Sequence, residues 1–208
     1  MTSWTRHLNF PVVGLTGSIS SGKTHVAEIA KTFGFLHVNT DGIAKEILKE
    51  NPEVQIKAFQ ITGIHPFDAG GSINKAFSIA LFSNPAMMRE YESYIHPLVF
   101  AHVRNLIDTL TPPYPKGLLI ESAIWRRLAA IPYFDSMWVI EAPERLREER
   151  FLQKHPEGQI LYAMIMKHQD VTSSNIKVPT FFLFNDGRDL HKEVKGVIQE
   201  TIDLWGRN

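Results

Sequence analysis

The chain has 208 residues, 44% of them hydrophobic, and its 22 basic residues balance its 22 acidic residues. This length and composition are typical of one α/β domain built around a single core. A neutral formal charge argues against a nucleic-acid-binding protein, because such proteins carry a surplus of Lys and Arg. Cysteine is absent, which excludes disulfides and thiolate metal sites and agrees with a reducing compartment.

No targeting or membrane segment is expected. Residues Met1–Pro11 lack the apolar core of a signal peptide, and no apolar run reaches the roughly 18 residues of a membrane helix. We therefore expect a soluble, cytoplasmic protein, with neither nucleic acid nor membrane as a partner. The oligomeric state stays open.

The first part of the chain predicts a strand, a loop and a helix, followed by a second strand and helix. Phe10–Thr16 is a short apolar run typical of a buried parallel strand, and Gly17–Gly22 is a Gly/Ser loop. Apolar residues then recur at helical spacing over Lys23–Phe33. Phe35–Val38 is the second strand, and another helical pattern opens at Asp41.

Residues 51–110 predict a helical insertion between strands. Helices are expected over Ile73–Phe82 and Asn84–Thr109, and Pro97 is expected to kink or split the second of them.

The last part returns to alternating strands and helices. Expected strands are Leu118–Glu121, Ser136–Glu141 and Thr180–Phe184, and expected helices are Arg145–Lys154, Gln159–Gln169 and Leu190–Trp205. Strands that alternate with helices predict an α/β fold, with a mainly parallel sheet covered on both faces.

One motif carries the strongest functional signal. After the first strand, the chain matches the pattern Gly-x-x-x-x-Gly-Lys-Ser/Thr with Gly17-Ser18-Ile19-Ser20-Ser21-Gly22-Lys23-Thr24. Loop amides and a helix N-terminus bind phosphate oxygens, Lys23 adds a full charge, and the Thr24 hydroxyl can coordinate Mg²⁺. The motif predicts nucleotide binding without choosing between kinase, GTPase and ATPase. The Asn-Lys-x-Asp signature of guanine recognition is absent, which favours Mg·ATP.

Further segments resemble dephospho-CoA kinases, and they occur in that family's order along nearly the whole chain. They are Gly14–Thr24, Asn39–Lys45, Gly70–Pro85, Tyr91–Pro97, Met137–Pro143 with Arg150, and Gln169 with Asn185–Gly187. The resemblance implies a P-loop kinase fold of three α/β/α layers. It also implies an acceptor-binding helical insertion at about 51–110 and a small helical lid at about 145–170. The implied reaction moves the γ-phosphoryl group of ATP, with Mg²⁺, to the ribose 3′-hydroxyl of dephospho-CoA, which gives CoA.

Two carboxylates are candidates for the chemistry beside Lys23. Asp41 follows the second strand, where ligands bind in open α/β sheets, and is the candidate base for the acceptor hydroxyl. Its alternative role is that of a helix N-cap. Glu121 ends a strand at a place where the family often has Asp, and it could hold a Mg²⁺-bound water together with Thr24. Its alternative is an ordinary acid at a strand end.

The resemblance also implies substrate contacts. Thr16, Lys45 and His96, with Asp41, are candidates for the acceptor side of the cleft. Thr16 could equally be a plain strand residue, and His96 a hydrogen-bonded structural residue.

Lys154 is the candidate lid cation for the ATP phosphates, although a solvated helix face would also explain it. We expect a structural ion pair for Arg147 and leave Arg150 open between the two roles. Asn185 and Gly187 are candidates for adenine contact, and an ordinary turn explains them nearly as well.

The chain departs from the family pattern at several of these places. Ser18 and Ser20 replace loop glycines, and a positive φ would strain a serine. Asn39 replaces an acid, and lysines replace arginines at Lys45 and Lys154. These changes keep two alternatives open. One is a P-loop kinase for another acceptor, such as a nucleoside or a sugar, and the other is a nucleotide-binding module without turnover.

Overall fold

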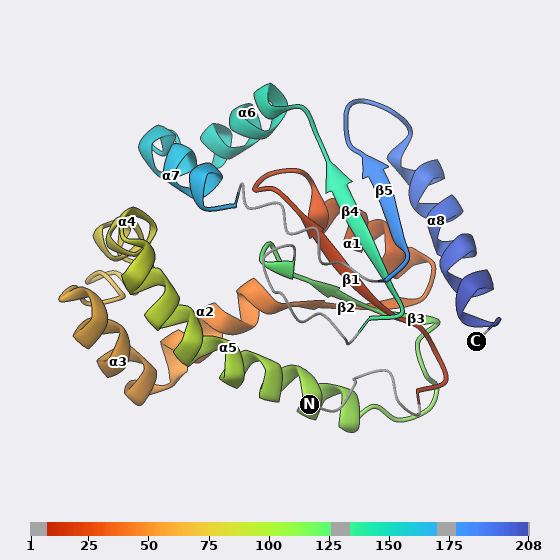
Figure 1. Cartoon of the computed structure of the whole chain (residues 1–208), viewed down its shortest axis with the longest axis horizontal. Coiled ribbons are helices and arrows are strands. Elements are labelled where there is room, and N and C mark those ends of the chain that lie inside the picture. Colours follow the sequence, from red (N-terminus) through yellow and green to blue (C-terminus); the bar gives the residue numbers. More distant parts are fainter. Residues whose placement is uncertain (1–7, 126–133, 170–177, 208) are drawn as a thin grey trace.

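The computed structural model describes residues 8–125, 134–169 and 178–207. Its centre is a sheet of five strands: β1 (Val12–Gly17), β2 (Phe35–Asn39), β3 (Gly117–Glu121), β4 (Ser136–Glu141) and β5 (Thr180–Phe184). The strand order is β2-β3-β1-β4-β5, and each neighbouring pair is parallel (Figure 1). The predicted strands are confirmed, with bounds that agree to within two residues.

Helices cover both faces of the sheet. Helices α1 (Lys23–Thr32) and α8 (Leu190–Trp205) pack on one face, while α5 (Pro85–Asp108) packs on the other. Along β1, Val12 belongs to the core on the α5 side and Val13 to the core on the α1 side. Successive side chains of a strand point to opposite faces, so a doubly covered strand is apolar throughout. The predicted three-layer α/β/α architecture is confirmed.

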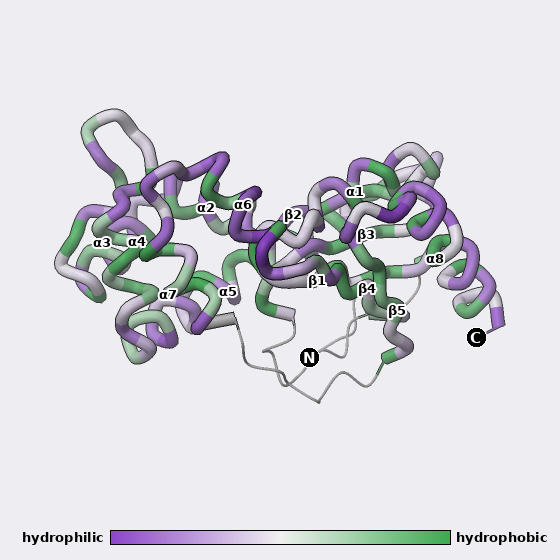
Figure 2. Tube along the Cα trace, turned by 90° about the horizontal axis from the view of Figure 1, so that it is seen from above, coloured by the Kyte–Doolittle hydropathy of each residue, from purple (hydrophilic) through white to green (hydrophobic). Residues whose placement is uncertain are grey.

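The chain between β2 and β3 forms a helical region, most of which lies beside the sheet (Figures 1 and 2). It contains α2 (Thr40–Glu50), α3 (Pro52–Thr62), α4 (Lys75–Ser83) and α5. Helix α3 was not predicted, although its ends carry ordinary signals. The Asn51 side chain accepts hydrogen bonds from the first turn, Pro52 occupies the first helical position, and Gly63 ends the helix at φ 70°.

Pro97 does not split the long helix. Helix α5 runs unbroken from Pro85 to Asp108 with Pro97 inside it, so of the two predicted effects, a kink or a split, the split is wrong. Buried residues on both sides of the proline, among them Ile95, Val99 and Val103, hold the helix against the core. Tertiary packing thus outweighs the one backbone hydrogen bond that proline cannot make.

Two further helices form a small separate layer near the carboxyl end of β4. Helices α6 (Glu144–Lys154) and α7 (Gln159–Gln169) enclose a minor core of Phe151, Tyr162 and Ile165. Arg147 joins them by donating to the Ala142 carbonyl and to the Met166 sulfur, so its contacts are structural but are not the predicted ion pair. Among the described residues, no helix combines the length and apolarity that a bilayer crossing requires.

Candidate functional site

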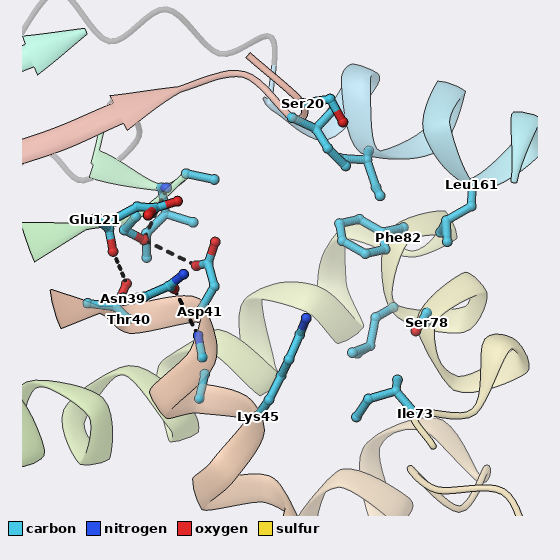
Figure 3. A pocket seen from close by; sticks show the side chains of 18 of the residues that line it. Ser20, Asn39, Thr40, Asp41, Lys45, Ile73, Ser78, Phe82, Glu121 and Leu161 are labelled. Carbon is cyan, nitrogen blue, oxygen red and sulfur yellow. Dashed lines mark hydrogen bonds between the residues drawn. The ribbon is translucent and has the colours of Figure 1, made fainter. Parts of the chain in front are cut away.

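A cleft of about 1170 Å³ lies where the carboxyl ends of β1, β2 and β3 meet the two helical regions. The chain leaves β1 for β2 and β3 on one side and later adds β4 and β5 on the other. In parallel sheets this switch point is where ligands bind. The cleft walls come from five parts of the chain: the loop after β1, the start of α2, the end of β3 with the residues that follow it, the region of helices α4 and α5, and the region of helices α6 and α7 (Figure 3).

The loop after β1 has the backbone of a phosphate-binding loop. A Cβ atom at Gly17 would lie 2.5 Å from the carbonyl oxygen of Ile140 on β4, so only glycine fits there. Gly22 has φ 105°, and a Cβ atom there would collide with the Asn185 side chain. The loop therefore runs close to its neighbours and turns directly into α1, whose N-terminus faces the cleft.

The two serines that replace loop glycines differ in conformation. Ser20 has φ 57°, the only positive φ of a non-glycine residue in the described part of the chain, and Ser18 keeps a negative φ. The strain expected at both positions is thus present at Ser20 alone.

Replacing Ser20 with glycine should raise the Tm of the nucleotide-free protein by about 1–4 °C. The left-handed conformation costs a residue with a Cβ about 1–2 kcal/mol, and the greater freedom of glycine in the unfolded chain cancels about half of that. Ser18→Gly is the matched control and should leave the Tm unchanged or lower it, because no strain is relieved. Thermal melts followed by circular dichroism test this. Equal shifts in the two variants would contradict it.

Lys23 lies at the centre of the site and is nearly buried. Its Nζ donates to the carbonyl oxygens of Gly17 (2.9 Å) and Ser18 (3.2 Å). Burial lowers the pKa of Lys23, while the nearby carboxylates of Asp41 and Glu121 act in the opposite direction. Thr24 is exposed and lines the cleft. The structure thus brings the two functional side chains of the motif to the same cleft.

Asp41 stands on the first turn of α2 and lines the cleft. Asn39 is the N-cap, since its Oδ1 accepts from the Gly42 amide at 3.0 Å, so the capping role considered for Asp41 is wrong. The carboxylate of Asp41 opens onto the cleft and accepts a long hydrogen bond of 3.4 Å from Ser122 Oγ (Figure 3).

The surroundings of Asp41 raise its pKa. The main cause is partial removal of the carboxylate from bulk water inside the cleft, and the Glu121 charge adds to it. Lys23, Lys45 and the Ser122 hydrogen bond oppose the rise. A carboxylate with a raised pKa that opens onto a cleft has the properties of a candidate general base.

Glu121 ends β3 beside Asp41 and is 3% exposed. Its Oε2 lies 2.9 Å from His37 Nε2, and its main-chain oxygen accepts from the Thr40 hydroxyl at 2.9 Å. His37 was not among the predicted site residues. A polar residue within the otherwise apolar strand Phe35–Val38 was the only signal that could have identified it.

The donors at this end of the cleft fit a magnesium ion held mainly by nucleotide phosphates. The described residues contain no group of three or more His, Asp or Glu side chains that could hold a metal by itself. Mg²⁺ commonly takes one or two protein oxygens and fills its remaining positions with water and substrate phosphates. Thr24 and Glu121 both line the cleft and provide such a donor set.

Of the residues predicted to bind the acceptor, some line the cleft and one does not. Lys45 and His96 line the cleft, and the His96 ring lies 5.9 Å from that of Phe100. Thr16 is fully buried on β1 and does not line the cleft, and its hydroxyl has no hydrogen-bond partner among the described residues. The structure therefore brings Lys45 and His96, but not Thr16, to the cleft that Asp41 lines.

Apolar side chains of the helical region form much of the remaining wall, and the sequence did not single them out. They are Ile73, Leu81, Phe82, Met88, Tyr91, Ile95, Val99 and Phe100. Burial raises the pKa of Tyr91 to about 12, so its hydroxyl is protonated at physiological pH. This wall suits an acceptor with a long uncharged portion.

The α6–α7 pair supplies a cation to the cleft and a link to the phosphate loop. Lys154 lines the cleft. Arg150 Nη2 donates to the side-chain and main-chain oxygens of Asn185 at 3.3 and 3.4 Å. Asn185 in turn donates from Nδ2 to the Ser21 carbonyl at 2.9 Å.

Both the oxygen and the nitrogen of the Asn185 side-chain amide therefore form hydrogen bonds within the protein. Gly187 lies in the exposed turn after β5, with φ 107°. The adenine contacts expected of both residues stay predictions. The side chain of Gln169 and residues 173–175, where departures from the family pattern were noted, lie outside the described residues.

Comparison with known proteins supports the sequence resemblance. A protein-family model described as dephospho-CoA kinase matches residues 11–190. A dephospho-CoA kinase of Staphylococcus aureus (strain bovine RF122 / ET3-1) is 29% identical over 154 residues, which is 69% of this chain and 70% of the relative. One from Carboxydothermus hydrogenoformans is 27% identical over 149 residues, with 71% and 72% covered.

Solved structures share the fold. The crystal structure of TT1252 from Thermus thermophilus superposes with a TM-score of 0.72 at 20% identity, covering 93% of this chain and 98% of that one. A dephospho-CoA kinase from Campylobacter jejuni gives a TM-score of 0.54 at 23% identity, with 92% and 97% covered. At these identities the likeness establishes the architecture alone.

Proposed function

The chain belongs to the dephospho-CoA kinase family, and we propose that its cleft transfers the γ-phosphoryl group of ATP to the ribose 3′-hydroxyl of dephospho-CoA. The observation that carries this proposal is the meeting of Lys23, Asp41 and Glu121 at the carboxyl ends of β1, β2 and β3. Phosphoryl transfer requires charge neutralisation, alignment of the acceptor and a place for its proton. These three residues can meet those requirements.

The phosphate loop neutralises the donor. Loop amides from Gly17 to Thr24 and the N-terminus of α1 bind phosphate oxygens of ATP. When the nucleotide binds, Lys23 Nζ exchanges the carbonyls of Gly17 and Ser18 for oxygens of the β- and γ-phosphates. The buried lysine thereby gains strong anionic partners in place of two neutral ones.

Asp41 receives the proton of the acceptor. Its carboxylate accepts the hydrogen of the 3′-hydroxyl while that oxygen forms a bond to the γ-phosphorus. The bond between the γ-phosphorus and the bridging oxygen breaks, and ADP leaves with that oxygen. A raised pKa brings the carboxylate closer to the operating pH than an ordinary aspartate, which favours general-base catalysis.

Magnesium would be held by the Thr24 hydroxyl and, through a bound water, by Glu121. When bound, the ion stabilises the negative charge that develops on the phosphate oxygens. This assignment rests on the donor set at the cleft and on the mode by which Mg²⁺ usually binds nucleotides.

The acceptor occupies the helical side of the cleft. Lys45 and His96 contact its polar groups, and the apolar wall of α4 and α5 accommodates its uncharged portion. Lys154 contacts the ATP phosphates from the opposite helical layer, and Gly187 lies toward the adenine. Because ATP is a cytoplasmic metabolite, we place the protein in the cytoplasm.

The rate should depend on pH through Asp41. Only the ionised carboxylate accepts a proton, so kcat should rise with pH through the pKa of Asp41. Because that pKa is raised, the acidic limb of the profile should have its midpoint above the ordinary value of about 4. Since the Lys45 charge lowers this pKa, Lys45→Met should move the midpoint to higher pH.

Lys49→Met, one turn further along α2, is the matched control and should leave the midpoint in place. Profiles of kcat between pH 4.5 and 8.5 provide the measurement. An acidic limb that is unchanged in Lys45→Met would contradict the assignment of the limb to Asp41.

Product analysis tests the proposed reaction. After incubation with Mg·ATP and dephospho-CoA, ³¹P spectra should show a new ribose 3′-phosphomonoester in amounts equal to the ADP formed. Adenosine offered as a rival acceptor should give no phosphorylated product. Phosphorylation of the nucleoside instead of dephospho-CoA would overturn the acceptor assignment.

A further inference from the structure

A buried hydrogen-bonded pair lies directly behind the proposed metal side of the cleft. His37 Nε2 and Glu121 Oε2 are 2.9 Å apart, and their side chains are 8% and 4% exposed. Glu121 lines the cleft, whereas His37 does not. The other carboxylate oxygen, Oε1, has no hydrogen-bond partner among the described residues. One oxygen of Glu121 is thus held by the protein, and the second is available to the cleft.

The sheet register brings the two residues together. In the parallel pair of β2 and β3, His37 is opposite Leu119 and Asn39 is opposite Glu121. Residues two apart along a strand share a face, so His37 and Glu121 are diagonal neighbours on the α1 side of the sheet. The strands, rather than a loop, set this contact.

The orientation of the buried Glu121 carboxylate is not fixed by the backbone alone. Its side chain has three rotatable bonds, so its carboxylate can take several positions at the end of β3. A donor from a rigid strand restricts those positions. It also offsets the electrostatic cost of keeping a carboxylate almost completely out of water.

We propose that His37 is a positioning residue for the metal side of the reaction. By holding Oε2, it directs Oε1 of Glu121 toward the metal-bound water. This inference rests on the proposed role of Glu121 in the Mg²⁺ site. His37 itself touches neither substrate nor metal and acts through the carboxylate, as the outer hydrogen-bond partners of metal sites commonly do.

Metal binding separates this role from a purely structural one. The apparent Kd of Mn²⁺, used as a probe for Mg²⁺, is measured by electron paramagnetic resonance at saturating ADP, and ADP affinity is measured separately in EDTA. His37→Leu should weaken Mn²⁺ binding by about tenfold while metal-free ADP affinity stays within about twofold of wild type. His37→Gln, whose amide can donate to the same oxygen, should restore most of the loss.

Two further variants make the result interpretable. His102→Leu, on the exposed surface of α5, controls for the substitution itself and should behave as wild type. If His37→Leu does not fold, His37→Asn takes its place, because its shorter amide keeps the polarity without reaching Oε2. Circular dichroism establishes that each variant is folded.

The outcomes also distinguish this inference from the proposed function. Unchanged Mn²⁺ affinity in the folded His37 variants, or a defect in His37→Gln as large as that in His37→Leu, would overturn the positioning role. If Glu121→Gln still lowers Mn²⁺ affinity in that case, the metal role of Glu121 stands and only His37 is excluded. If Glu121→Gln has no effect either, the proposed metal site itself fails.

Discussion

Asp41→Asn should lower kcat for CoA formation by about 10²-fold or more, because the amide keeps the shape of the side chain but cannot accept the hydroxyl proton. The KM values for ATP and dephospho-CoA should change much less than kcat. Steady-state kinetics at pH 8 measure both quantities. Asp108→Asn, at the exposed end of α5, is the matched control and should retain full activity.

Asp41→Asn should leave the fold intact. Because the pKa of Asp41 is raised in the folded state, the folded protein binds more protons than the unfolded chain between the two pKa values. At pH values above both pKa values, the ionised Asp41 therefore lowers the free energy of unfolding. Below the pKa that Asp41 has in the unfolded chain, this destabilisation is absent. At pH 8 the Tm of Asp41→Asn should equal or exceed that of wild type. A lower Tm would point to a structural role for the carboxylate.

Lys23→Met should abolish nearly all activity, with a loss of about 10³-fold in kcat/KM. Methionine fills similar space but removes the charge that neutralises the β- and γ-phosphates. It also removes the hydrogen bonds to Gly17 and Ser18, each worth about 1 kcal/mol, although the protein no longer has to bury an ammonium group. Stability should therefore change little while ATP affinity falls.

Lys31→Met provides the comparison for this variant. Lys31 lies on the same helix but forms an exposed ion pair with Glu28, which contributes little. The activity and the ATP affinity of Lys31→Met should match those of the wild-type protein. ATP binding by calorimetry and turnover by product formation measure the two effects. Normal turnover in Lys23→Met would exclude the loop as the phosphate site.

The features that the sequence predicted are those encoded by local pattern. The loop from Gly17 to Thr24 is a contiguous motif between a strand and a helix, and Asp41 follows the next strand. Parallel strands place such residues at one edge of the sheet, so their convergence on one cleft could be expected. The apolar strands that alternate with helices are also a local pattern, and they predicted a sheet covered by helices on both faces.

The features that the sequence did not predict depend on contacts between distant residues. His37 and Glu121 are 84 residues apart, and only the register of β2 and β3 makes them neighbours. The link from Asn185 to Ser21 spans 164 residues. The unbroken course of α5 through Pro97 likewise follows from packing on both sides. Helix α3 is different, since its N-cap Asn51 and its C-cap Gly63 are local sequence signals.

We expect this cleft to phosphorylate dephospho-CoA. A coupled assay of ADP release from Mg·ATP by the wild-type protein, with and without dephospho-CoA, measures this reaction. We predict ADP release that requires dephospho-CoA and that yields CoA mole for mole. A folded protein that binds ATP but releases ADP at the same rate without the acceptor, or forms no CoA, would contradict this expectation.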